Sequence, residues 1–177
     1  MSQRNTVVRA MHDTGLAAWF GGSLMGAVGL NGATAQASSP QERTGLSAEG
    51  WARWAPVNAV AIGAHVVGGL GLLAGNKGRL AHQDETQANT LVKTALTGAA
   101  MGLTAYSGKL GREVQKHAQE GGAGATEPAP GASTELAKAQ RRLRVCQWAI
   151  PAVTGVLVVM GAQQGEQQRP VAGLLHR

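Results

Sequence analysis

The side chain best placed for chemistry is a histidine inside a long uncharged segment. His65 lies near the middle of residues 54–76, which contain no Asp, Glu, Lys or Arg. An ionisable group in such a segment is costly to bury in lipid and often marks a site for protons or ligands. Asn58 lies two turns earlier on the same helix face. With three threonines of other segments, these residues form a predicted polar site: His65, Asn58, Thr97, Thr104 and Thr154.

Two interpretations of this polar site stay open. A neutral histidine can hydrogen-bond to a threonine or a carbonyl of a neighbouring helix and hold the two helices together. It can equally handle a proton or bind a ligand. A bis-histidine haem needs a second histidine at the same depth, but His12 lies at a segment boundary and His82 and His117 lie in connectors. We therefore expect no cofactor and no metal site.

The sequence contains none of the common enzymatic motifs. It has no phosphate-binding loop ending in Lys-Ser or Lys-Thr, no His-Glu-x-x-His and no Gly-x-Ser-x-Gly. The single cysteine, Cys146, excludes an internal disulfide and a cysteine-based metal cluster within one chain. We therefore expect a protein that is not an enzyme.

The elements that must position the polar site are long uncharged segments. The 177 residues include 26 Gly, and only 15% are charged and 3% aromatic, so few large side chains are available for a water-driven core. About 20 apolar residues cross a bilayer. The pattern predicts an all-α fold in one integral membrane domain, a bundle of four transmembrane helices at residues 14–35, 54–76, 89–108 and 145–165.

The third segment is the weakest of the four. Only residues 94–108 are uncharged, so a full span requires Lys93 to extend from the first turn toward the membrane surface. Asp13 or Thr14 is expected to cap the first helix at its N-terminus.

Polar connectors separate the segments. A Ser-, Pro- and Gln-rich connector covers residues 37–53, and a short one covers residues 76–90. Residues 109–144 form an extramembrane polar connector, whose flexible tip at residues 121–133 offers no core-forming side chains. Charged helix formers on both sides of the tip predict that the third and fourth helices extend beyond the bilayer as a polar hairpin.

Positive charges gather just before the fourth segment. Trp51 and Trp54 flank the second segment in the manner of an aromatic belt. The net charge of +6 is thus accounted for by membrane contact, and we expect no nucleic-acid partner because the cations do not alternate with stacking aromatics. The cations expected to contact lipid headgroups or an acidic partner are Lys138, Arg141, Arg142 and Arg144.

Small residues recur four positions apart within three of the segments. In lipid such faces let helix backbones approach closely, since no hydrophobic force drives helices together there. The lipid bilayer is one expected partner, and a homo-oligomer or a larger membrane protein complex is the other. The predicted helix-packing residues are Gly22, Gly26, Gly71, Gly75, Gly98 and Gly102.

The two halves of the chain share spacings that fit a 2+2 internal duplication. Gly26 and Gly32 have the separation of Gly102 and Gly108, and Trp-Ala opens both the second and the fourth segment. Chance matching in a Gly-rich sequence is the competing interpretation. Lys and Arg are nearly balanced between the two sides of the membrane, so the orientation stays open.

These features favour a small multi-pass protein of the bacterial cell membrane. We expect it to serve as a non-enzymatic accessory, assembly or scaffold subunit of a membrane complex. One alternative is a small transporter, channel or holin-like pore former that uses the polar face around His65. The other is a soluble helical interaction protein.

Overall fold

The prediction of an all-α fold is confirmed. The computed structural model describes residues 6–75 and 84–167, without side chains for 84–87 and 164–167, and within these residues it contains helices and no strand. Residue 76 and His82 lie outside the described residues. The elements are α1 (Thr6–Met25), the π-helical turn η1 (Gly26–Leu30), α2 (Asn31–Thr34), α3 (Pro40–Gly75), α5 (Asp84–Lys116), the 3₁₀ turn η2 (Ala118–Glu120) and α6 (Thr134–Gln167).

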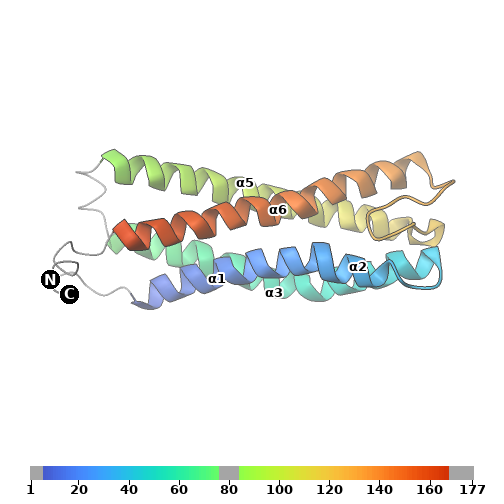
Figure 1. Cartoon of the computed structure of the whole chain (residues 1–177), viewed down its shortest axis with the longest axis horizontal. Coiled ribbons are helices and arrows are strands. Elements are labelled where there is room, and N and C mark those ends of the chain that lie inside the picture. Colours follow the sequence, from blue (N-terminus) through green and yellow to red (C-terminus); the bar gives the residue numbers. More distant parts are fainter. Residues whose placement is uncertain (1–5, 76–83, 168–177) are drawn as a thin grey trace.

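The helices lie lengthwise side by side in an elongated molecule (Figure 1). Segments α1, η1 and α2 form one continuous rod that runs antiparallel to α3, and α5 runs antiparallel to α6. The α1 rod packs chiefly on α3 and next on α6, whereas α5 packs chiefly on α6. The start of α1 and the end of α3 thus share one end of the molecule with the start of α5 and the end of α6.

Helix α3 begins much earlier than expected, because the predicted connector at residues 37–53 is wrong beyond Ser39. The helix starts at Pro40, a residue that suits the first helical position because its missing N–H needs no partner there. The Ser39 hydroxyl accepts the N–H of Glu42 at 3.1 Å, and the Glu42 carboxylate accepts the N–H of Ser38 at 3.1 Å. This reciprocal capping starts the helix.

The expected cap of the first helix is also wrong. Helix α1 already begins at Thr6, so Asp13 lies inside it and the Thr14 hydroxyl donates to the Ala10 carbonyl one turn back. By contrast, α5 runs to Lys116 and α6 starts at Thr134, which agrees with the helical extensions predicted from the charged flanks.

Two cores follow each other along the molecule, and Leu103 packs against both. The first core lies between uncharged stretches of the helices, and the second core lies between charged stretches. We call residues 14–30, 54–75, 94–108 and 145–165 the apolar half, and residues 35–53 and 109–144 the head. The first core contains Leu16, Trp19, Ala61, Ala100, Ile150 and Leu157, and the second Leu110, Val114, Leu136, Ala139, Leu143 and Cys146.

Two helices, α3 and α6, are long and apolar enough to cross a membrane. Among the described residues the other two long helices fall short of the same hydropathy level. Spans at residues 14–35 and 89–108 therefore stay predictions.

Glycines bring α1 and α3 into backbone contact. A Cβ on Gly15 would lie 2.5 Å from the Ala61 carbonyl oxygen, and one on Gly68 would lie 2.5 Å from the His12 nitrogen. Glycine is required at both positions, since no Cβ tolerates such a distance from backbone. The sequence interpretation had included Gly68, four positions after Ala64, among the small residues of the packing faces, but it had not included Gly15.

The six glycines predicted for packing divide into two groups. Gly22 and Gly26 make room for the indole rings of Trp54 and Trp51, and Gly71 lies against Val8. On α5, a Cβ on Gly98 or Gly102 would meet nothing within 4 Å, and Gly75 is exposed at the end of α3.

The two halves of the chain pack differently where the duplication would make them alike. Trp54 covers Gly22 on α1, whereas Trp148 on α6 is 50% exposed and Gly98 on α5 is uncovered. The π-helical turn at Gly26–Leu30 has no counterpart in α5. The duplication stays a prediction.

We expect Gly68→Ala to lower the stability of the protein by about 1–3 kcal/mol, because the new Cβ forces the α1 and α3 backbones apart. Gly98→Ala is the matched control, since the same change on α5 meets open space and improves helix propensity. Unfolding in mixed detergent micelles measures both. Equal stability of the two variants would contradict the close approach of α1 and α3.

Candidate functional site

His65 is buried where α1, α3 and α5 meet, with 4% of its surface exposed. Its Nδ1 lies 3.1 Å from the His12 carbonyl oxygen, which can only accept, so Nδ1 carries the proton. Its Nε2 lies 3.4 Å from the Thr97 hydroxyl, which then donates to it in the neutral ring. Both nitrogens of His65 are thus engaged with neighbouring helices.

His12 is the second histidine of this site, and the sequence interpretation had placed it outside. Its ring lies 4.1 Å from the His65 ring between centroids, at an interplanar angle of 38°. Its Nδ1 lies 2.9 Å from a carboxylate oxygen of Asp13, a residue exposed at the molecular surface. Gly68 and Gly69 of α3 leave the space that His12 fills.

Trp19, two turns after His12 on α1, joins α1 to α5 within the apolar half. Its side chain is fully buried, and its Nε1 donates to the Thr104 hydroxyl at 3.2 Å. Thr104 in turn donates to the Ala100 carbonyl of its own helix at 2.8 Å. The Trp19 ring also meets the His65 ring edge-on, with 6.3 Å between centroids.

The predicted polar site is therefore only partly assembled. Thr97 contacts His65, but Thr104 pairs with Trp19 and the Thr154 hydroxyl donates to the Ile150 carbonyl of its own helix. Asn58 is buried, and its Oδ1 has no hydrogen-bond donor among the described residues.

A second polar cluster, centred on Asn31, was not predicted. The Asn31 Nδ2 donates to Gln147 Oε1 at 2.7 Å, and its Oδ1 accepts the Trp51 indole N–H at 3.0 Å and the Ser47 hydroxyl at 3.4 Å. One amide thus ties α2 to α3 and α6. It follows the π-helical turn Gly26–Leu30 directly, and such turns redirect the side chains that follow them.

The tip at residues 121–133 is packed against the head, so the expectation that it offers no core is wrong. Ala125 and Thr126 are buried, and Gln140 of α6 donates to the Gly124 and Ala125 carbonyls at 3.5 Å. Gly121 has a φ of 75°, a conformation that favours glycine, and it lies against Pro40 at the start of α3.

Glu120 holds the first turn of α6 from outside the helix. Its carboxylate accepts the Ser133 N–H at 2.8 Å and meets His117 Nδ1 at 2.6 Å, while the Ser133 hydroxyl accepts the Leu136 N–H at 3.2 Å. The hydrogen bonds from Ser133 are the main reason that the pKa of Glu120 is lowered. In the same region Lys116 lowers the pKa of Glu113 by hydrogen bonding and by its charge.

The basic residues beside α6 separate into two groups. All four predicted contact cations, Lys138, Arg141, Arg142 and Arg144, are exposed. Only Arg144 lies near a carboxylate among the described residues, 3.5 Å from an oxygen of Glu127. Arg142 donates to the Tyr106 hydroxyl of α5 at 3.4 Å.

The interior of the described part has few means for chemistry. No three His, Cys, Asp or Glu side chains of residues 6–75 and 88–163 lie close enough to hold a metal ion together. An apolar groove of about 310 Å³ runs between α1 and α3 and has no titratable lining residue. Its walls are Gly22, Met25, Gly26, Leu30, Gly50, Trp51 and Trp54.

No protein family, no curated protein and no solved structure matches this chain in sequence or fold. Its function must therefore be inferred from its own residues.

We expect the Trp19–Thr104 hydrogen bond to contribute about 1 kcal/mol, a usual value between membrane helices. A double-mutant cycle with Trp19→Phe and Thr104→Val isolates this coupling from the loss of packing. Trp19→Phe with Thr154→Val is the control cycle, because the Thr154 hydroxyl bonds within its own helix. Comparable coupling in both cycles would mean that Thr104 does not join α5 to α1.

We expect Glu120→Gln to lower the thermal unfolding midpoint at pH 7. A carboxyl whose pKa is lowered on folding stabilises the protein above its ordinary pKa, and this contribution is lost as the pH falls through the lowered value. The difference between wild type and variant should thus shrink below about pH 4.5. Glu49→Gln, which breaks only an exposed ion pair with Arg53, should change the midpoint little. A Glu120→Gln effect that does not depend on pH would contradict this assignment.

Proposed function

We propose that this chain is an integral membrane protein of four spanning helices and that it acts as a non-enzymatic accessory or scaffold subunit of a membrane complex. The observation that carries the proposal is a common level at which α3, α5 and α6 change from apolar to charged and at which the uncharged residues 14–30 of the α1 rod end at the polar Asn31. The apolar half lies in the bilayer, and the head lies outside it.

Hydrogen bonds between the helices fix this level. Asn31 is bonded to Trp51 and Gln147, and Tyr106 to Arg142, so the four helices are aligned within about one and a half turns. Beyond the level on one side, no charged residue occurs in residues 14–30, 54–75, 94–108 or 145–165. The surface of a bilayer at this height accounts for the shared change in α3, α5 and α6.

The length of the apolar half fits a bilayer. At about 1.5 Å per residue, residues 54–75 extend about 33 Å and residues 145–165 about 31 Å, against about 30 Å of hydrocarbon. Residues 14–30 and 94–108 extend only about 26 Å and about 23 Å, so α1 and α5 reach the far surface with the turns that contain Asp13 and Lys93. The outward side chains of this half are apolar: Val60 is 73% exposed and Leu70 62% exposed. Such a surface is stable in lipid and a liability in water.

The closed interior favours a scaffold over a transporter or an enzyme. Both His65 nitrogens are hydrogen-bonded, Trp19 fills the space beside them, and the groove between α1 and α3 is apolar. Polar groups engaged in this way hold helices together. Asn58 Oδ1 is the buried acceptor of the predicted site that is left without a donor among the described residues. Partners are instead expected on the head, where Leu46 is exposed among the charged residues of α3.

We expect single cysteines in intact membranes to map the proposed level. On a Cys146→Ala background, Glu49→Cys and Lys138→Cys in the head should react with a membrane-impermeant maleimide from one side. Val60→Cys and Val156→Cys, both exposed on the apolar half, should react only after denaturation in detergent. Equal labelling of Val60→Cys and Glu49→Cys, or release of the protein by alkaline carbonate, would refute membrane insertion.

We further expect the head to contact another protein. A photo-crosslinking residue at Leu46 should yield a discrete protein adduct in cells, and the same residue at Val60 should not. The competing transporter function predicts solute or ion flux by purified protein in liposomes, abolished by His65→Ala. Flux without an adduct at Leu46 would replace the scaffold proposal.

A further inference from the structure

We propose that exposed cations of α5 and α6 form a binding site for the headgroups of anionic phospholipids. This inference rests on the proposed membrane insertion. It assigns one class of ligand to the level where the apolar half meets the head. Its cations are Lys109, Arg112, Lys138, Arg141 and Arg142.

Two helices contribute to the site at one height. The Arg142 guanidinium donates to the Tyr106 hydroxyl at 3.4 Å, which joins the last apolar turn of α5 to the last basic turn of α6. Because the helices run antiparallel, Lys109 on α5 and Lys138 on α6 both lie about one turn further into the head. The Arg112 guanidinium folds back to Gly108, 3.8 Å from the position of a Cβ there, and so toward the apolar half.

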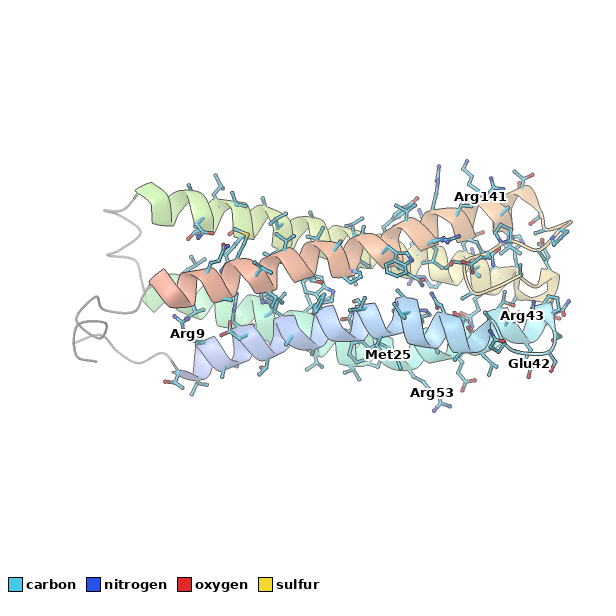
Figure 2. All side chains as sticks on the ribbon, in the orientation of Figure 1. Arg9, Met25, Glu42, Arg43, Arg53 and Arg141 are labelled. Atoms are coloured by element: carbon cyan, nitrogen blue, oxygen red, sulfur yellow. The ribbon has the colours of Figure 1, made fainter. Side chains whose placement is uncertain are left out.

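The cations of this site have no carboxylate partners, which sets them apart from other cations of the head. Among the described residues, no carboxylate lies within ion-pair distance of any of the five. Elsewhere in the head, Arg53 pairs with Glu49 at 2.6 Å, Lys116 with Glu113 at 3.0 Å and Arg144 with Glu127 at 3.5 Å. Arg43 of α3 donates to the Ala37 and Ala123 carbonyls instead. The five cations of the site have neither kind of partner in the described part of the chain, and Figure 2 shows Arg141 and Arg53 on opposite sides of the molecule.

The surface next to these cations is suited to acyl chains. On α6, Val145 is 68% exposed and is followed by the half-exposed Trp148. On α5, Tyr106 and Met101 are exposed on the apolar side of Lys109. Cations above and apolar side chains below match a lipid whose phosphate carries negative charge, whereas a soluble acidic partner would not need the apolar part.

The structure also changes the predicted set of contacts. Arg144 was expected to take part, but its ion pair with Glu127 directs it to the tip of the head. Lys109 and Arg112 were not expected, because the predicted polar hairpin did not give the register between the end of α5 and the start of α6.

Native mass spectrometry of the delipidated full-length protein in detergent tests the site, with phosphatidylglycerol and phosphatidylcholine as probes. We expect wild type to retain phosphatidylglycerol selectively and to gain thermal stability from it. Lys109→Gln/Arg141→Gln/Arg142→Gln should bind it at least about tenfold more weakly, since each cation near a lipid surface contributes about fivefold. Arg53→Gln/Lys116→Gln/Arg144→Gln removes the same charge from paired positions and should keep the affinity.

The controls separate folding, net charge and insertion. If the first triple variant does not fold, Lys109→Arg/Arg141→Lys/Arg142→Lys should still bind, and high salt should weaken lipid binding to wild type. Equal loss in both glutamine variants, or no lipid preference in wild type, overturns the site. An acidic protein that copurifies with wild type but not with the first variant, without lipid preference, assigns the surface to protein instead. A wild type that resists carbonate extraction without preferring the lipid refutes the site alone.

Discussion

The close approach of α1 and α3 is the constraint on which the other contacts depend. Gly15 and Gly68 let backbone lie on backbone, so the register of the two helices has no freedom to slide. That register puts the His12 carbonyl against His65 in the apolar half and Asn31 against Trp51 near the head. One steric condition therefore positions both polar clusters.

The apolar half and the head differ in how their polar groups are hydrogen-bonded. In the apolar half, His65 and Trp19 meet partners on other helices and Thr154 meets one on its own turn, as the proposed bilayer requires. Asn58 Oδ1 and Trp54 Nε1 are buried without a partner among the described residues. In the head, helix ends need capping: Glu42 supplies the carboxylate for α3 from within the helix, whereas Glu120 supplies it for α6 from η2. This second arrangement explains why the tip between η2 and α6 is packed against the head.

The sequence predicted the helices well and their contacts poorly. Charge-free length located the apolar half, and the Ser39 to Glu42 capping signal, although overlooked, would have started α3 correctly. His12 was excluded because α1 was expected to begin at Asp13 or Thr14, yet His12 lies two turns before Trp19 on one face. No local sequence pattern shows that the Thr104 hydroxyl accepts a hydrogen bond from Trp19 instead of contacting His65. Which residue Thr104 contacts depends on how α5 is shifted and tilted against α1 and α3.

Helix α5 is the least apolar of the four long helices, and its attachment to α1 and α3 accounts for the polar side chains in the interior. The backbone of α5 lies near α6 along much of its length but approaches α3 only briefly. In the proposed bilayer, apolar side chains on α5 gain no hydrophobic free energy by facing α1 or α3 instead of acyl chains, so close packing and hydrogen bonds must hold this helix. The hydrogen bonds from Thr97 to His65 and from Trp19 to Thr104 supply the missing attraction. His65 thus connects α3 to α5 through the Thr97 hydroxyl and to α1 through the His12 carbonyl.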